Sequence, residues 1–140
     1  MKIASDQAMS ALGTQIAAQL HGGQVIELIG DVGAGKTTFT KGLARGLGIT
    51  EAVQSPTFTI SRRYQGKRWH LAHYDFYRLD DAGIMQDELA ETLADRDTIT
   101  VIEWAGSVAG ILPADHITIT ITADAADANA RYVHIQGINI

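Results

Sequence analysis

The chain contains no cysteine, which excludes disulfides, thiolate nucleophiles and zinc or iron–sulfur sites held by cysteine. The absence of cysteine is also compatible with a reducing compartment. No apolar run approaches the ~20 residues of a membrane-spanning helix. The N-terminal residues, MKIASD, have no hydrophobic core of a signal peptide. We therefore expect a soluble, cytoplasmic protein.

A surplus of positive charge is also missing. Eleven Lys and Arg stand against 16 Asp and Glu, so the formal net charge is −5. Strong unaided binding to nucleic acid usually requires a basic excess, and the charge balance argues against it. The composition, 46% apolar and 19% charged, is typical of a globular chain. We expect residues 1–140 to form a single domain.

The pattern of apolar residues and glycines predicts an alternation of helices and strands. Ser5 is suited to cap a helix that extends to Leu20. Two short apolar runs, Val25–Ile29 and Thr98–Ile102, are typical of buried strands. The other expected elements are a helix over Lys36–Leu47, a hairpin of Thr57–Tyr64 with Trp69–Tyr77, an acidic helix over Ala82–Ala94, and a terminal hairpin with strands through Ile117–Ile121 and Val133–Ile135.

Residues Gly30–Thr37, GDVGAGKT, fit the pattern G-x-x-x-x-G-K-[ST] between an expected strand and an expected helix. Glycines let the backbone approach phosphate oxygens, and the helix N-terminus offers them partial positive charge. Lys36 can reach the β- and γ-phosphates, the Thr37 hydroxyl can bind Mg²⁺, and Thr38 adds a hydroxyl beside the α-phosphate. The motif predicts a nucleotide site and an α/β, P-loop NTPase-like three-layer fold, with a mixed, mainly parallel sheet and β-hairpin insertions.

Glu103 is the first candidate for a carboxylate beside this loop. It directly follows the expected strand Thr98–Ile102, and ligands of open α/β sheets lie at the C-terminal ends of strands. If this strand lies parallel to Val25–Ile29, Glu103 points towards the Mg²⁺ beside Thr37. The alternative is an exposed carboxylate at the end of a strand.

Asp75 is the second candidate, because it is a lone acid within the aromatic segment HYDFYRL. A carboxylate in such a place either forms a structural salt bridge or works at a site. From the residues alone both alternatives stay open, and His73 and Arg78 are the candidate salt-bridge partners.

Three further residues are candidates for the nucleotide site. Ser55 and Thr57 flank Pro56 in a short loop, where a hydroxyl can sense the γ-phosphate and Mg²⁺; ordinary turn chemistry is the alternative. Trp104 can pack beside the nucleotide or simply belong to the core.

The N-K-x-D segment that small GTPases use for guanine is missing, so we expect ATP. Asp80–Gly83 fits D-x-x-G, and we interpret it as the turn at the start of a helix.

Four segments, in this order, resemble the TsaE (YjeE) family of bacterial ATPases. They are GDVGAGKTT (30–38), SPTF (55–58), HYDFYRL (73–79) and IEW (102–104). The resemblance implies that Glu103 binds Mg²⁺ with Thr37, that Asp75 is catalytic or orients water, and that Trp104 contacts the nucleotide. It also implies a switch segment at Ser55 and Thr57, and contacts with the nucleotide base at Asp6 and Arg131. The acid that the family often carries after Glu-Trp is absent, because Ala105-Gly106-Ser107 stands there.

The expected site therefore has three groups of residues. The catalytic residues are Lys36, Asp75 and Glu103; the nucleotide-binding residues are Asp6, Gly33, Ala34, Gly35, Lys36, Thr37, Thr38, Ser55, Thr57, Trp104 and Arg131; the metal ligands are Thr37 and Glu103.

The resemblance also implies a function. The family provides the accessory ATPase of the TsaB–TsaD complex, which forms threonylcarbamoyladenosine at adenosine 37 of tRNAs reading codons that start with A. Hydrolysis is expected to be weak without these partners, and tRNA is reached through the complex. The basic residues Arg62, Arg63, Lys67 and Arg68 are either a solvated face or a contact with an acidic partner or tRNA. The competing functions are a small P-loop kinase and a nucleotide-binding module that does not hydrolyse ATP.

Overall fold

The computed structural model describes residues 1–31, 33–54, 60–77 and 83–140. The helices in these ranges are α1 (Asp6–Ala17), α2 (Lys36–Gly46), α3 (Ile84–Ala94) and the 3-10 helix η1 (Ala105–Ile111). The strands are β1 (Lys2–Ile3), β2 (Val25–Ile29), β3 (Ser61–Gln65), β4 (His70–Asp75), β5 (Thr98–Glu103), β6 (Ile117–Ala123) and β7 (Arg131–Gln136). None of the helices described is both long enough and apolar enough to cross a bilayer.

The described strands form one seven-stranded sheet in the order β1-β7-β6-β2-β5-β4-β3. Strands β6, β2, β5 and β4 are mutually parallel. The pairings β1–β7, β6–β7 and β3–β4 are antiparallel. The hairpins β3–β4 and β6–β7 thus add antiparallel strands on either side of the parallel core. The prediction of a mixed sheet is confirmed, but only its core is parallel. The pairing of β5 with β2, on which the expected position of Glu103 depends, is also confirmed as parallel.

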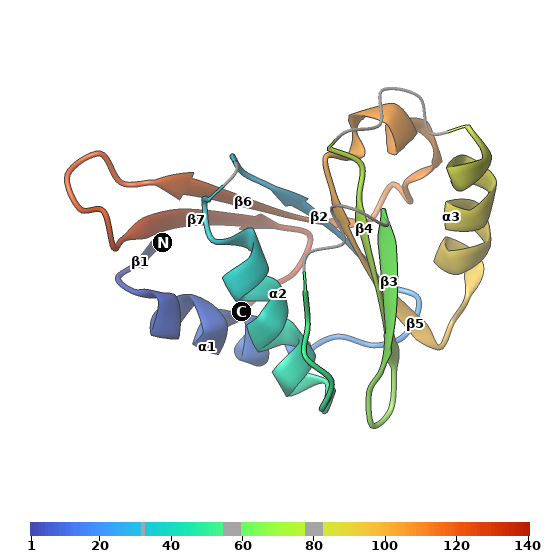
Figure 1. Ribbon diagram of the computed structural model, residues 1–140, viewed down its shortest axis with the longest axis horizontal. Helices are drawn as coiled ribbons and strands as arrows, with labels where there is room; N and C mark the ends of the chain where they lie inside the picture. The colour runs from blue at the N-terminus through green and yellow to red at the C-terminus, as the bar shows by residue number, and fades with distance from the viewer. Residues whose placement is uncertain (32, 55–59, 78–82) are drawn as a thin grey trace.

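Helices cover both faces of this sheet and produce three layers (Figure 1). Helices α1 and α2 pack on one face, where Ile16 and Phe39 are fully buried against sheet residues such as Ile26. On the other face, α3 and η1 cover β4 and β5 through Leu89 and Val108. Strands β2 and β5 are adjacent and parallel near the centre of the sheet, so their C-terminal ends lie side by side. The segments that follow these two strands therefore begin next to each other.

Helices α1 and α2 approach each other closely at glycines. A Cβ atom at Gly13 would overlap the carbonyl oxygen of Phe39, and one at Gly42 would overlap the carbonyl oxygen of Ser10. The hydroxyl of Thr14 donates a hydrogen bond to the carbonyl of Gly42 at 2.8 Å. The position of α2, which begins where the glycine-rich loop ends, thus depends on a direct backbone contact with α1.

The substitution Gly42→Ala is expected to destabilise the fold by about 1–3 kcal/mol, because the added methyl group forces the two helices apart. The matched control is Gly110→Ala, where a Cβ atom meets nothing within 4 Å. Urea unfolding of both variants measures the difference. Equal free energies of unfolding for the two variants would show that the helices adjust without cost.

Some element boundaries differ from the prediction. The short strand β1 and the helix η1 were not predicted, because two residues carry no periodicity and a 3-10 helix has no strong sequence signal. The first hairpin was placed correctly, with β3 beginning at Ser61. The predicted strand start at Thr57 and helix start at Ala82 lie outside the described residues.

Candidate functional site

The glycine-rich loop connects the C-terminal end of β2 to the N-terminus of α2. Gly33 and Gly35 have φ angles of 84° and 106°, in the region that favours glycine. At Gly30 a Cβ atom would lie 2.7 Å from the carbonyl oxygen of Ile121 on β6. These glycines allow a tight turn directly before α2, whose first backbone N–H groups have no partner within the helix. Such a helix start is an anion-binding arrangement.

Lys36, the first residue of α2, is only 6% exposed. Its Nζ atom lies 3.4 Å from Oε1 of Glu103. The same atom lies 4.4 Å from the ring centroid of Trp104. The ammonium group is thus held between a carboxylate and an indole, which are the kinds of partner that a buried cation requires.

Glu103 ends β5 and is buried. Its Oε2 atom pairs with Nε2 of His73 on β4, whereas Oε1 faces Lys36. Burial by itself would raise the pKa of Glu103. The hydrogen bond from His73 and the charges of His73 and Lys36 outweigh burial, so this pKa lies below its usual value. Glu103 is therefore a carboxylate at neutral pH, at the place that the sequence predicted.

Asp75 ends β4 and lies directly opposite Glu103 in the β4–β5 register. It is 7% exposed, and its Oδ1 atom accepts a hydrogen bond from the Tyr77 N–H at 2.9 Å. Burial is the main reason why the pKa of Asp75 is raised, and the hydrogen bond from Tyr77 opposes this effect. Neighbouring carboxylates with pKa values displaced in opposite directions are typical of sites that assign them different roles.

Trp104 follows Glu103 in a left-handed backbone conformation, with φ of 57°. Such a conformation is uncommon for a bulky residue and is found preferentially at functional sites. The indole also packs against the ring of Tyr77, with centroids 4.8 Å apart. Its position over Lys36 brings the indole next to the glycine-rich loop, while the predicted contact of Trp104 with a nucleotide stays a prediction.

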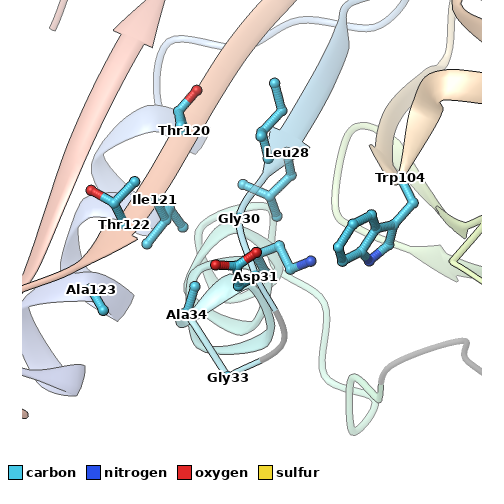
Figure 2. A pocket seen from close by; sticks show the side chains of 12 residues that line it. Leu28, Gly30, Asp31, Gly33, Ala34, Trp104, Thr120, Ile121, Thr122 and Ala123 are labelled. Atoms are coloured by element: carbon cyan, nitrogen blue, oxygen red, sulfur yellow. The ribbon is translucent and has the colours of Figure 1, made fainter.

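A cavity of about 520 Å³ lies between the glycine-rich loop, the end of β6 and Trp104. Figure 2 shows the indole on one side, the side chains of Thr120–Ala123 on the other, and the loop between them. Ligand cavities commonly measure about 300–1,000 Å³. This cavity therefore has room for a ligand in contact with the loop.

Arg131 on β7 contacts the same loop. Its Nε donates a hydrogen bond to the carbonyl of Ala34 at 3.1 Å, and Nη2 donates one to the carbonyl of Gly33 at 3.4 Å. The terminal hairpin thus supports the loop through a guanidinium group. Asp6, in the first turn of α1, lies instead on a separate groove of about 590 Å³ that Thr38 also lines.

The oxygen donors in the site fit Mg²⁺. Thr37 lies beside Lys36 in the first turn of α2, and Glu103 supplies an ionised carboxylate. In the described part of the chain, no group of three or more His, Asp or Glu side chains is arranged to hold a metal. Mg²⁺ suits such a site, because it usually binds one or two protein oxygens and takes its other ligands from phosphates and water.

The structure brings most of the predicted residues together, places Asp6 and Thr38 on the separate groove, and leaves the others undescribed. Gly33, Ala34, Gly35, Lys36, Thr37, Asp75, Glu103, Trp104 and Arg131 gather at one edge of the sheet. Ser55, Thr57 and Arg78 lie outside the described residues, as do Asp80 and Asp81 of the D-x-x-G segment.

The hydrogen bond between His73 and Glu103 was not predicted, since His73 was a candidate salt-bridge partner of Asp75. In the sheet, Asp75 is opposite Glu103, so His73 lies diagonally across from Glu103 on the same face. The alternation along β4 was a usable signal, but only once the register with β5 was known.

Comparisons with known proteins agree with this geometry. The family model "Threonylcarbamoyl adenosine biosynthesis protein TsaE" matches residues 3–133. A Treponema pallidum protein is 42% identical over 125 residues, covering 89% of this chain and 91% of its own. A Streptomyces coelicolor protein is 36% identical over 135 residues, covering 93% and 90%. Both relatives are named tRNA threonylcarbamoyladenosine biosynthesis protein TsaE.

A solved structure supports the same relationship. The crystal structure of YdiB from Bacillus subtilis superposes with a TM-score of 0.76 at 34% sequence identity, covering 95% of this chain and 80% of YdiB. The family model and the relatives span nearly all of the chain, including both central strands, the glycine-rich loop and Glu103. The chain therefore belongs to the TsaE family of threonylcarbamoyl adenosine biosynthesis proteins.

Proposed function

We propose that this chain is a Mg²⁺-dependent ATPase that serves the synthesis of threonylcarbamoyladenosine at adenosine 37 of tRNAs reading codons that start with A. The observation that carries the proposal is the arrangement around Lys36. Its ammonium group follows a glycine-rich loop and lies 3.4 Å from the Glu103 carboxylate, while Asp75 lies opposite Glu103 on the neighbouring strand. Family membership supports the pathway, since similar proteins carry its name.

The loop and the start of α2 bind the phosphates in this proposal. The backbone N–H groups of Gly33, Ala34 and Gly35 contact phosphate oxygens, that of Ala34 after it leaves the carbonyl of Asp31, to which it donates a hydrogen bond at 3.0 Å. Lys36 leaves Glu103 to contact the β- and γ-phosphates. Thr37 and Glu103 would hold Mg²⁺, and Thr38, whose side chain lines the groove beside Asp6, lies on the α-phosphate side of the loop in this proposal. When bound, Mg²⁺ neutralises charge on the β- and γ-phosphate oxygens.

Asp75 has the role of orienting the attacking water and accepting its proton. Two observations support this assignment. The carboxylate is buried beside the phosphate-binding residues, and its raised pKa makes it a better proton acceptor than an ordinary aspartate. Glu103, whose pKa is lowered, stays ionised and faces Lys36. The proposal therefore assigns metal binding to Glu103 and proton transfer to Asp75.

The chain acts, in this proposal, as the accessory subunit of the TsaB–TsaD complex and reaches tRNA through it. In the described residues, the Arg131 guanidinium is bonded to loop carbonyls and Arg63 to the hydroxyl of Thr92, so neither is free to reach a γ-phosphate in this conformation. A partner protein that supplies a cation to the γ-phosphate would compensate for this, so we expect the hydrolysis rate to rise when the complex assembles. Exposed basic residues of the β3–β4 hairpin, including Arg62 and Lys67, are available to an acidic partner surface.

Phosphate release from Mg-ATP, with and without the TsaB–TsaD complex, tests the proposal. We expect slow release by the chain alone and faster release in the complex. Transfer of phosphate to a small acceptor would instead indicate a kinase. An absence of turnover under both conditions would reduce the protein to a nucleotide-binding module.

The fluorescence of Trp104 is expected to change when Mg-ATP binds, because Lys36 then moves away from the indole. The variant Trp69→Phe leaves Trp104 as the only indole. As Mg-ATP is added, the emission of Trp104 should change until it saturates. The Mg-ATP concentration at half of this change should equal the dissociation constant of the nucleotide. The matched control is Trp104→Phe, in which only Trp69 reports, packed against the core and Arg68. An equal response from both variants would contradict the position of Trp104 in the site.

A further inference from the structure

His73 is fully buried, and the one hydrogen bond of its side chain within the described residues is with Glu103. Glu103 is ionised and can only accept, so Nε2 of His73 carries the hydrogen atom. The other ring nitrogen, Nδ1, has no hydrogen-bond partner among the residues described. Burying a polar ring with half of its hydrogen bonds unmade costs free energy. An apolar residue would fill the space without that cost, so the contact with Glu103 calls for an explanation.

The two oxygens of Glu103 have different environments. Oε2 is held by the ring of His73, which lies on β4, the strand next to β5 in the sheet. Oε1 faces Lys36 at 3.4 Å, which is longer than the 2.7–2.9 Å typical of a strong charge-assisted hydrogen bond. Oε1 is therefore the oxygen that can change its partner, and Oε2 is the one that stays fixed.

We propose that His73 is a positioning residue, which holds Oε2 of Glu103 so that Oε1 can exchange Lys36 for the Mg²⁺ that accompanies the nucleotide. Without this hydrogen bond the carboxylate is free to rotate and follow the departing ammonium group. This inference rests on the proposed function, because it assigns Glu103 to the metal. It adds a residue that contacts neither the nucleotide nor the metal.

The experiment measures how strongly Mg²⁺ improves nucleotide binding. The affinity for a fluorescent ATP analogue is determined in EDTA and at increasing Mg²⁺ concentrations. The titration gives the Mg²⁺ concentration at which the gain in affinity over the EDTA value reaches half of its maximum. Three variants are compared with the wild type. His73→Leu removes the donor, His73→Gln keeps an uncharged N–H donor on a side chain of similar reach, and Leu71→Ala makes a cavity on the same strand and face.

His73→Leu is expected to raise this Mg²⁺ concentration by about 10- to 100-fold, the usual effect of removing a hydrogen-bond partner from a metal ligand. Its affinity in EDTA should stay unchanged, because the loop and Lys36 are intact. His73→Gln should restore the wild-type Mg²⁺ response. Leu71→Ala should lower the thermal unfolding temperature without altering that response.

Two results with the His73 variants would overturn the inference: a wild-type Mg²⁺ response in His73→Leu, or an equal loss in His73→Gln. Both leave the proposed function intact, because the wild type still couples nucleotide and Mg²⁺. A wild type that binds the analogue equally well in Mg²⁺ and EDTA would instead contradict the metal role of Glu103, and with it the role of His73. An altered Mg²⁺ response in Leu71→Ala would show that general disruption of the core is sufficient.

Discussion

If the chain is the proposed ATPase, we expect the substitution Lys36→Ala to lower the rate of ATP hydrolysis by roughly 10²–10³-fold, the usual effect of removing one group that stabilises the charge of a transition state. Lys36 is the cation that follows the glycine-rich loop, and its Nζ atom already faces the site at 3.4 Å from Glu103. The exposed helix residue Lys41 provides the matched control, since Lys41→Ala removes the same charge from α2 away from Glu103. Steady-state phosphate release measures both variants.

The same variant has a second consequence that does not depend on nucleotide. Lys36 is one of the groups that keep the pKa of Glu103 low, so its removal raises that pKa. Removing one partner of a buried ion pair also destabilises a fold, by about 3–5 kcal/mol when nothing else compensates. Here His73 remains as a partner, so we expect a smaller loss. Full turnover in Lys36→Ala, or equal losses in Lys41→Ala, would contradict the phosphate role of Lys36.

Much of the site could be predicted because it depends on local sequence and on one topological rule. The glycines, Lys36 and Thr37 are contiguous, and their order between a strand and a helix determines their geometry. Glu103 required only that its strand lies parallel to β2, which the structure bears out. At these positions the local sequence motif and the tertiary structure favour the same conformation, as they do in most sequences that fold to one structure.

Other features needed information that the chain does not carry locally. The bond between His73 and Glu103 depends on the register of β4 against β5, and a shift of one residue would turn His73 to the other face. The contact of Arg131 with the loop joins residues 97 positions apart and was not predicted, because the family resemblance implied only a contact of Arg131 with the nucleotide base. The raised pKa of Asp75 likewise arises from burial that the aromatic neighbours suggested but did not establish.

The substitution Asp75→Asn is expected to lower turnover by roughly 10²–10⁴-fold, the range for loss of a general base. Asparagine can still accept the hydrogen bond from the Tyr77 N–H, so the loop after β4 should keep its position. Nucleotide affinity should therefore change little. In the wild type, the acid limb of the pH–rate profile should lie above the ordinary aspartate pKa of 3.8, because the pKa of Asp75 is raised. Stopped-time phosphate assays and nucleotide titrations from pH 4 to 8 measure both effects.

The same substitution should stabilise the protein, and the gain should depend on pH. A raised pKa means that the folded state binds the proton of Asp75 more tightly than the unfolded chain does. The corresponding stability is present below the unfolded value of 3.8 and is lost as the pH rises through the folded pKa. Asparagine carries no charge at any of these pH values, so Asp75→Asn should exceed the wild type in unfolding temperature more at pH 7 than at pH 4.

The control for this gain is Asp115→Asn, which makes the same change at an exposed carboxylate outside the candidate site. A gain in stability together with a loss of turnover would mean that the fold retains a buried charge at a cost because the reaction needs it. A variant that turns over normally, or one whose stability relative to the wild type does not vary with pH, would show that Asp75 is an ordinary structural carboxylate. The two measurements thus decide between the two roles that the sequence alone left open for Asp75.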